Sequence, residues 1–481
     1  MEEVPGSIPG TALFVGFLSS SINMDCFRLK NLSEKYEEYL NLTKHENYTQ
    51  ELSNPRNPAI DNFCLVGTFL EDYVGLYTEL TQMYSTRQTD ASLEFKTALA
   101  AYAAGEYSDA FNLAKDLVVV DKSIEVYQLL IKLCINHLDI PEFGVRFAKL
   151  GLEVHPQNTL LNFGMAIGYA LLGDKAIYYT EKLSLWQKAL GILKTSPSTK
   201  PDYLLYKSLL LAKCGEIQEA VVNAAEGYKL TSDHRYSALL GLLLVSKEDY
   251  TGCLKLIKRS CEANPKNQLL KAVNLVCQMK YYEIIKDKNI VNKAILSLLK
   301  ASGDFEEVGS PQSPEDRSVL RPIQEESSNY ESVDSRDFFT KLNCSNNYPV
   351  FKQALKLAFQ AAILVENLDL AEWCAGMIEQ KNYEIEILRY YREGSTQGLE
   401  HFIACEGACE LLAKIHLEKG NLSSAMTLAR QIIRLNEQNK SAWTILGVIY
   451  KQKEEKKKAM QCLLAALNCV NVPFGLIPFY V

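Results

Sequence analysis

The C-terminal part of the sequence repeats itself with a period of 34 residues. Ala413 precedes Gly447 by this interval, and Ala425 precedes Ala459 by the same interval. A unit of this length is too small to bury its apolar side chains by itself, so neighbouring units must stack against one another. The period therefore predicts a solenoid of stacked repeats.

The residue types inside the unit indicate an antiparallel pair of helices. Trp443, Gly447 and Tyr450, followed by two alanines, form the pattern typical of the tetratricopeptide repeat. Small residues are needed where two helices approach closely, and large residues fill the space between them. With the weaker upstream copies, the expected structural positions are Ala98, Gly105, Ala110, Gly215, Ala220, Gly241, Pro265, Gly420, Ala425, Trp443, Gly447, Tyr450, Ala459 and Ala466.

These units predict an all-α fold, a right-handed superhelical solenoid of tetratricopeptide-like helix pairs. The repeats are expected over residues 91–301 and 338–481, and residues 1–90 are expected to form an atypical N-terminal helical cap. Residues 302–337 contain ten acidic residues, three Arg and eight Ser, which predicts a disordered acidic insertion. Ser310 and Ser313 each precede a proline and are candidate phosphorylation sites; the alternative is a tolerated loop without a regulatory role.

Charge and composition argue against several classes of protein. The formal net charge is -7, so the chain offers no general basic surface for nucleic acid. The longest apolar run, Ala238–Val245, is much too short to span a bilayer. The acidic start Met1-Glu2-Glu3 is not typical of a secretory signal. The thirteen scattered cysteines are expected to be reduced, buried thiols of a cytosolic protein.

No motif of an enzyme is present in the sequence. It lacks the glycine-rich phosphate and dinucleotide loops, the paired histidines of zinc proteases and the nucleophile elbow. We therefore expect no catalytic residue and no cofactor. A helical enzyme whose site carries no known motif is the alternative class.

One group of residues has the composition of a metal site. His401, Cys405 and Cys409, with His416 beyond them, have spacings that would place them on one helical face. His401 and Cys409 would then lie about 12 Å apart along the axis. One zinc ion, bound at about 2.0–2.3 Å, does not reach both. We therefore expect no metal, and we expect the two cysteines to pack between helices.

A basic run occupies Lys451–Lys458. It falls at the turn between the two helices of the last repeat, where a solvated turn is the expected role. Contact with a partner or with anionic lipid is the alternative.

The end of the chain carries a further pattern. After the last repeat the sequence reads Val472-Pro473-Phe474-Gly-Leu-Ile477-Pro478, and upstream it contains Leu239-Leu240-Gly241 and Ala263-Asn264-Pro265. These segments resemble the tetratricopeptide repeat protein 7 family, whose members finish with a Leu-Pro-Phe-x-x-Ile-Pro tail after such a repeat. The acidic insertion lies where that family carries a variable loop.

The resemblance implies an adaptor. Members of the family are the adaptor of the plasma-membrane phosphatidylinositol 4-kinase III alpha complex, and they bind the kinase, a palmitoylated membrane anchor protein and, in animals, hyccin. The prediction is a non-catalytic protein-binding scaffold, cytoplasmic and held peripherally at the plasma membrane by its partners. The alternative is a tetratricopeptide scaffold of another assembly, such as a chaperone, trafficking or cell-cycle complex. The family has no binding motif from which partner-binding residues could be assigned.

Overall fold

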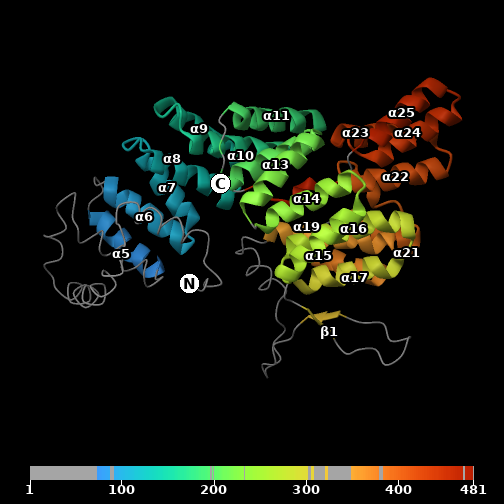
Figure 1. Cartoon of the computed structure of the whole chain (residues 1–481), viewed down its shortest axis with the longest axis horizontal. Coiled ribbons are helices and arrows are strands. Elements are labelled where there is room, and N and C mark those ends of the chain that lie inside the picture. Colours follow the sequence, from blue (N-terminus) through green and yellow to red (C-terminus); the bar gives the residue numbers. More distant parts are fainter. Residues whose placement is uncertain are drawn as a thin grey trace. The chain divides into compact units, whose positions relative to one another are not determined.

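The computed structural model describes residues 73–86, 91–195, 198, 200–231, 233–301, 305–307, 320–322, 348–378, 383–469 and 472–479. In this part of the chain, consecutive helices form antiparallel pairs that stack in sequence order (Figure 1). The prediction of an all-α solenoid of helix pairs is confirmed. The described residues form two compact units, and the first contains the described residues up to Leu172 together with residues 192–195. The second contains Gly173–Gly191 and Pro197–Phe479.

The first unit is built from helices of 9 to 17 residues. They are α5 (Tyr73–Thr86), α6 (Ala91–Ala104), α7 (Tyr107–Leu117), α8 (Ile124–Lys132) with the π-helix η1 (Leu133–His137), α9 (Pro141–Val154) and most of α10 (Thr159–Lys175). A buried aromatic group joins α6 and α7 to η1, since the ring of His137 stacks on Tyr107 with centroids 3.8 Å apart. Burial and the nearby Lys132 lower the pKa of His137 to about 4, so this ring is neutral at physiological pH.

The second unit continues the same arrangement. Its helices are α11 (Tyr179–Thr195), α12 (Pro201–Lys213), α13 (Ile217–Leu230), α14 (His234–Ser246), α15 (Tyr250–Ala263), α16 (Gln268–Ile285), α17 (Lys288–Ala301), α19 (Tyr348–Leu364), α20 (Leu368–Met377), α21 (Tyr383–Glu393), α22 (Glu406–Glu418), α23 (Leu422–Leu435), α24 (Lys440–Gln452) and α25 (Lys456–Asn468). Two 3-10 turns, η2 (Leu399–Phe402) and η3 (Phe474–Leu476), complete it.

The turn inside several helix pairs has one recurring geometry. A residue one or two positions after the first helix has positive φ, as at Gly105 (88°), Gly215 (89°) and Gly420 (76°). The next residue donates its N–H to the carbonyl five positions back, for example from Glu216 to Leu211 at 2.8 Å. This is the Schellman motif, and it satisfies carbonyls that the helix end leaves free. Glycine is favoured there because an L side chain is strained at positive φ.

Three pairs place a glutamate at this position instead of glycine. Glu248, Glu366 and Glu454 have φ of 61°, 59° and 62°. Because the left-handed conformation costs a side-chain-bearing residue about 1–2 kcal/mol, Glu248→Gly is expected to stabilise the protein by about 1 kcal/mol. Chemical denaturation with circular dichroism would measure this. As the control, Glu219→Gly in the first turn of α13 is expected to destabilise, and a loss of stability in Glu248→Gly would contradict the strain.

Successive pairs stack through a second recurring contact. The residue that caps the C-terminus of the second helix donates its N–H to a carbonyl four positions back. The residue with this carbonyl is Gly151 in α9, Gly227 in α13 and Ile432 in α23. In the first two cases the residue faces the third residue of the next helix. A Cβ on Gly151 would approach Leu161 Cδ1 to 2.9 Å, and a Cβ on Gly227 would overlap the ring of Tyr236.

The large and the small side chain of this contact can be exchanged from one pair to the next. Where the second helix has Gly227, the next helix presents the fully buried Tyr236. Where the second helix has Ile432, the equivalent third residue of the next helix is Ala442, and both belong to one buried cluster. Close packing tolerates either combination because the summed volume is similar.

The insertion contains the described strands. β1 (Phe305–Glu307) and β2 (Leu320–Pro322) pair antiparallel, with Phe305 opposite Pro322. The other residues of the expected disordered insertion, 302–337, lie outside the described part of the chain. The candidate phosphorylation sites Ser310 and Ser313 are among them. Residues 1–72 of the expected N-terminal cap also lie outside it.

Candidate protein-binding surface

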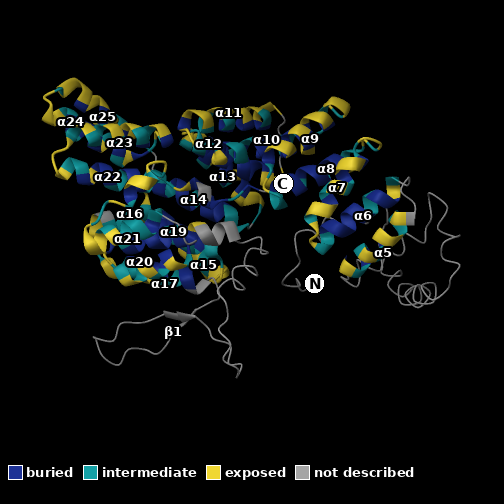
Figure 2. Ribbon diagram, turned by 180° about the vertical axis from the view of Figure 1, so that it is seen from behind, coloured by how far each residue is buried: buried dark blue, intermediate teal, exposed yellow. Residues whose placement is uncertain are grey.

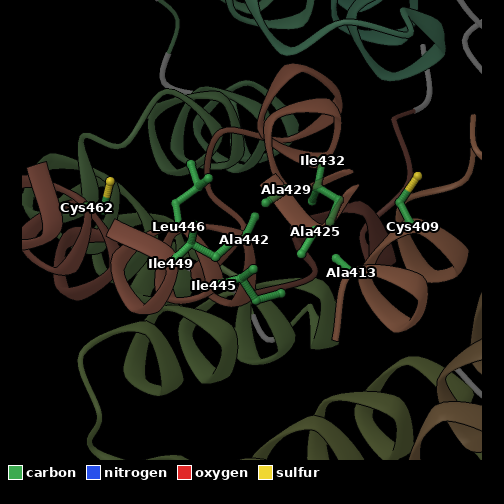
Figure 3. Close-up of a cluster of buried hydrophobic side chains, with 10 residues drawn as sticks. All are labelled: Cys409, Ala413, Ala425, Ala429, Ile432, Ala442, Ile445, Leu446, Ile449 and Cys462. Carbon is green, nitrogen blue, oxygen red and sulfur yellow. The ribbon is translucent and has the colours of Figure 1, made fainter. Parts of the chain in front are cut away.

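The last two helix pairs, α22–α23 and α24–α25, share a continuous apolar core (Figure 3). The core consists of small and branched residues: Cys409, Ala413, Ala425, Ala429, Ile432, Ala442, Ile445, Leu446, Ile449 and Cys462. Figure 3 shows these side chains in a row that crosses from α22 to α25. The row gives the C-terminal end of the second unit a rigid framework on which surface side chains are held.

The expected repeat residues of the last pair lie in and around this core. Gly447 allows α24 and α25 to approach, because a Cβ there would lie 2.9 Å from Leu463 Cδ2. Ala459 and Ala466 are buried on α25. Trp443 packs against the core and donates its Nε1–H to the Glu437 carbonyl at 2.8 Å. Packing is therefore the role that the structure gives these residues.

Upstream, the expected positions fall at helix contacts and turns. Ala98, Ala110, Ala220 and Ala425 are fully buried. A Cβ on Gly241 would lie 2.9 Å from both Ile257 and Val273, so this glycine admits two neighbouring helices. Three of the expected positions, Gly105, Gly215 and Gly420, lie in turns with positive φ. Pro265 is exposed between α15 and α16. The Tyr450 hydroxyl accepts a hydrogen bond from Arg430 at 3.2 Å.

The histidine and cysteine group does not lie on one helix. His401 is in η2, Cys405 precedes α22, and Cys409 and His416 are within α22. Burial raises the pKa of Cys409 to about 11, and its thiol donates to the Ile403 carbonyl at 2.8 Å. The expectation of one shared helical face was wrong, because the chain turns at residues 399–405. Within the described ranges, no set of three His, Cys, Asp or Glu side chains is placed to hold a metal ion.

A polar cluster joins α12 to α14. The Arg235 guanidinium donates to Asp233 at 2.7 Å and to Asp202 at 2.6 Å. Burial raises the pKa of Asp233, but hydrogen bonds from Arg235 more than offset this and hold the pKa below its usual range. The Tyr236 hydroxyl donates to the Pro201 carbonyl at 2.5 Å. The segment Asp233-His234-Arg235 therefore joins two helix pairs.

The tail that follows α25 returns to the beginning of the second unit. Residues Phe474–Leu476 pack on α12 and α19, and Phe479 is buried against Tyr206 with ring centroids 5.3 Å apart. In the sequence, this tail is recognisable only by its family resemblance. Its alternation of apolar residues and prolines indicates an extended packed segment, but nothing local in the sequence identifies helix α12 as its partner.

Lys213 lies at the centre of the tail contact. Its Nζ lies 4.8 Å from the centroid of the Phe479 ring and 5.2 Å from that of Trp186. It also pairs with Asp174 Oδ1 at 2.6 Å, and Trp186 Nε1–H donates to the same oxygen at 3.0 Å. The lysine side chain is only 5% exposed. Sequence reasoning missed this group, since its members are scattered over 305 positions.

The outward side of α25 exposes apolar side chains. Met460, Leu463, Leu464 and Leu467 are 60%, 39%, 51% and 74% exposed. Met460, Leu464 and Leu467 are four and three residues apart, so they lie on one side of the helix, and Leu463 lies at the edge of that side, next to Gly447 of α24. In Figure 2 the last pair is among the parts with many exposed positions. An apolar face of this kind is typical of a protein-binding surface.

Basic residues lie at the N-terminal end of this apolar face. The last pair and its flanks, residues 440–469, contain six lysines and two glutamates, in a chain of net charge -7. Lys458 pairs with Glu455 at 2.6 Å. Among the described residues, Lys456 and Lys457 form no ion pair, and both are exposed one turn before Met460.

Residues 441–468 match the family model of the tetratricopeptide repeat. The chain is a helical-repeat protein that carries this repeat at its last described helix pair.

The chain is also similar to human tetratricopeptide repeat protein 7A, with 23% identity over 229 residues. The match covers 45% of this chain and 26% of the human protein, so it spans about a quarter of that relative.

Two solved structures of other repeat proteins are similar. The human IFIT1 dimer with PPP-AAAA has 15% identity and a TM-score of 0.42, and the alignment covers 94% of this chain and 96% of that one. The thermophilic repeat protein TTC0263 of Thermus thermophilus has 16% identity and a TM-score of 0.32, with 44% and 99% covered. Within the described residues, no helix is long and apolar enough to cross a membrane.

Proposed function

We propose that the chain is a non-catalytic, protein-binding adaptor. The observation that carries this proposal is the exposed apolar side of α25 on a rigid helical framework. Stacked helix pairs present extended surfaces for other proteins. The two polar groups described above, Arg235 with Asp202 and Asp233 and Lys213 with Asp174, are paired within the chain.

The proposed complex is the one that recruits or stabilises a phosphatidylinositol 4-kinase at the plasma membrane. The support is the similarity to human tetratricopeptide repeat protein 7A, together with the Pro473–Pro478 tail. In this proposal the partners are a lipid kinase and a membrane anchor protein. The chain lies in the cytoplasm and reaches the membrane only through those partners, without binding nucleic acid.

Affinity purification of the tagged chain, followed by mass spectrometry, tests this proposal. Recovery of a large phosphatidylinositol 4-kinase together with a membrane anchor protein is expected. Recovery of another assembly without a lipid kinase would contradict the kinase adaptor and would favour a scaffold of a different complex.

A further inference from the structure

The exposed side of α25 carries several large apolar side chains. Met460, Leu464 and Leu467 are all more than half exposed. Neighbouring exposed apolar residues of this kind are typical of an interaction site. Exposed apolar residues at this spacing lose contact with water when another helix lies along them. The surface therefore has the character of an interface whose partner is another molecule.

The chain's own tail does not supply the missing cover. After α25, residues Phe474–Leu476 pack on α12 and α19, and Phe474, Leu476, Ile477 and Phe479 are buried. The apolar residues that follow α25 are thus already used elsewhere.

The charges around the apolar residues define the chemistry of the partner. Lys456 and Lys457 lie one helical turn before Met460 and on the same side of α25. Helix α25 contains no Asp or Glu, so a second copy laid along it would bring no carboxylate to these lysines from that helix. A partner helix with acidic residues beside an apolar stripe would satisfy both features, since complementary charge favours association and fixes the register.

We infer that the exposed side of α25 binds an amphipathic helix of a partner protein whose apolar stripe is flanked by Asp or Glu. This inference rests on the proposed adaptor function and specifies its partner chemistry. The apolar stripe of the partner covers Met460, Leu464 and Leu467. Its acidic residues pair with Lys456 and Lys457. The exposed residues extend over eight positions, about 10 Å of helix, so two to three turns of the partner suffice.

A pair of synthetic peptides tests the inference. Each peptide has about 18 residues, long enough to be helical, with leucines at three- and four-residue intervals. One carries glutamates beside the leucines, and the other carries lysines at the same positions. Fluorescence anisotropy with the full chain is expected to give binding of the acidic peptide that is at least about tenfold tighter than binding of the basic peptide. Equal binding, or no binding of the acidic peptide, would overturn the inference.

Three variants locate the binding to α25. Leu464→Glu/Leu467→Glu is expected to weaken the acidic peptide about tenfold or more, because two exposed anchors become charged. Lys456→Glu/Lys457→Glu is expected to reverse the preference between the peptides. Val222→Glu, at a position that is 66% exposed on α13, is the matched control and is expected to bind as the unmodified chain does. Unchanged binding in the two α25 variants would overturn the inference.

Two further measurements distinguish the proposed partner helix from a second copy of the chain and from a membrane surface. Concentration-dependent dimerisation in analytical ultracentrifugation that Leu464→Glu/Leu467→Glu abolishes would identify a second copy and overturn the inference. Sedimentation with phosphatidylserine vesicles that Lys456→Glu/Lys457→Glu abolishes, with no peptide preference, would identify a membrane surface and also overturn it.

The adaptor proposal and this inference fail separately. If the chain recovers a lipid kinase complex, and Leu464→Glu/Leu467→Glu recovers the complete complex equally well, the adaptor proposal stands and the α25 inference is overturned.

Discussion

Gly227→Ile is expected to destabilise the protein by about 3 kcal/mol. A side chain at this position must enter the space filled by Tyr236, which is fully buried and held by its hydrogen bond to the Pro201 carbonyl. Overpacking of a filled core typically costs about 1–3 kcal/mol, and the branched side chain brings this substitution to the upper end. Chemical denaturation with circular dichroism measures the loss.

A second substitution at Tyr236 is expected to restore part of the lost stability, because it exchanges the large and the small side chain of this contact. Tyr236→Ala alone should cost about 3–5 kcal/mol, because a large buried side chain and its hydrogen bond are lost. Gly227→Ile/Tyr236→Ala reproduces the combination at Ile432 and Ala442, and it is expected to cost less than the two single changes together by about 2 kcal/mol. If the loss of stability in the double variant equalled the sum of the two single losses, the exchange of side-chain sizes would be contradicted. Gly376→Ala is the control, since no atom lies within 4 Å of a Cβ there.

Phe479→Ala is expected to cost about 3 kcal/mol and to loosen the first helices of the second unit. Phe479 is 3% exposed and lies against Tyr206 and Lys213. Removing a buried aromatic ring typically costs about 3–5 kcal/mol, and this position is placed at the lower end of that range. Hydrogen exchange should accelerate in α12 as well as in the tail.

Pro473, six positions before Phe479, provides the control for this experiment. It lies in the same tail but is exposed, so Pro473→Ala is expected to leave hydrogen exchange in α12 unchanged. If Phe479→Ala also left the denaturation midpoint and the exchange of α12 unchanged, the tail would contribute nothing to the unit.

The all-α fold could be predicted because the repeat encodes it locally. Small residues such as Ala425 and Ala459 lie where helices touch, and Gly215 and Gly420 lie at the positive-φ turns. The equivalent turns at Glu248 and Glu366 gave no such signal, since glutamate is a favourable helix residue. Stacking against the next pair imposes the turn there.

The surface features were harder to predict than the fold. The basic run Lys451–Lys458 was visible, but its exposure beside Leu464 depends on which side of α25 packs on α24. The contact between Phe479 and Tyr206 joins positions 273 residues apart. A pattern of neighbouring residues carries no information on such a pairing, because it arises from the path of the intervening helices.

The returning tail also affects how the second unit is assembled during synthesis. A solenoid whose repeats touch only their neighbours can fold from one end as it is made. Helix α12 leaves the ribosome long before Phe479, by about 13 to 53 seconds at usual rates of translation. During this interval the apolar surface around Tyr206 and Lys213 has no cover, so nascent chains are open to chaperones at α12. Arrival of the tail then converts a series of separately formed repeats into one cooperative unit.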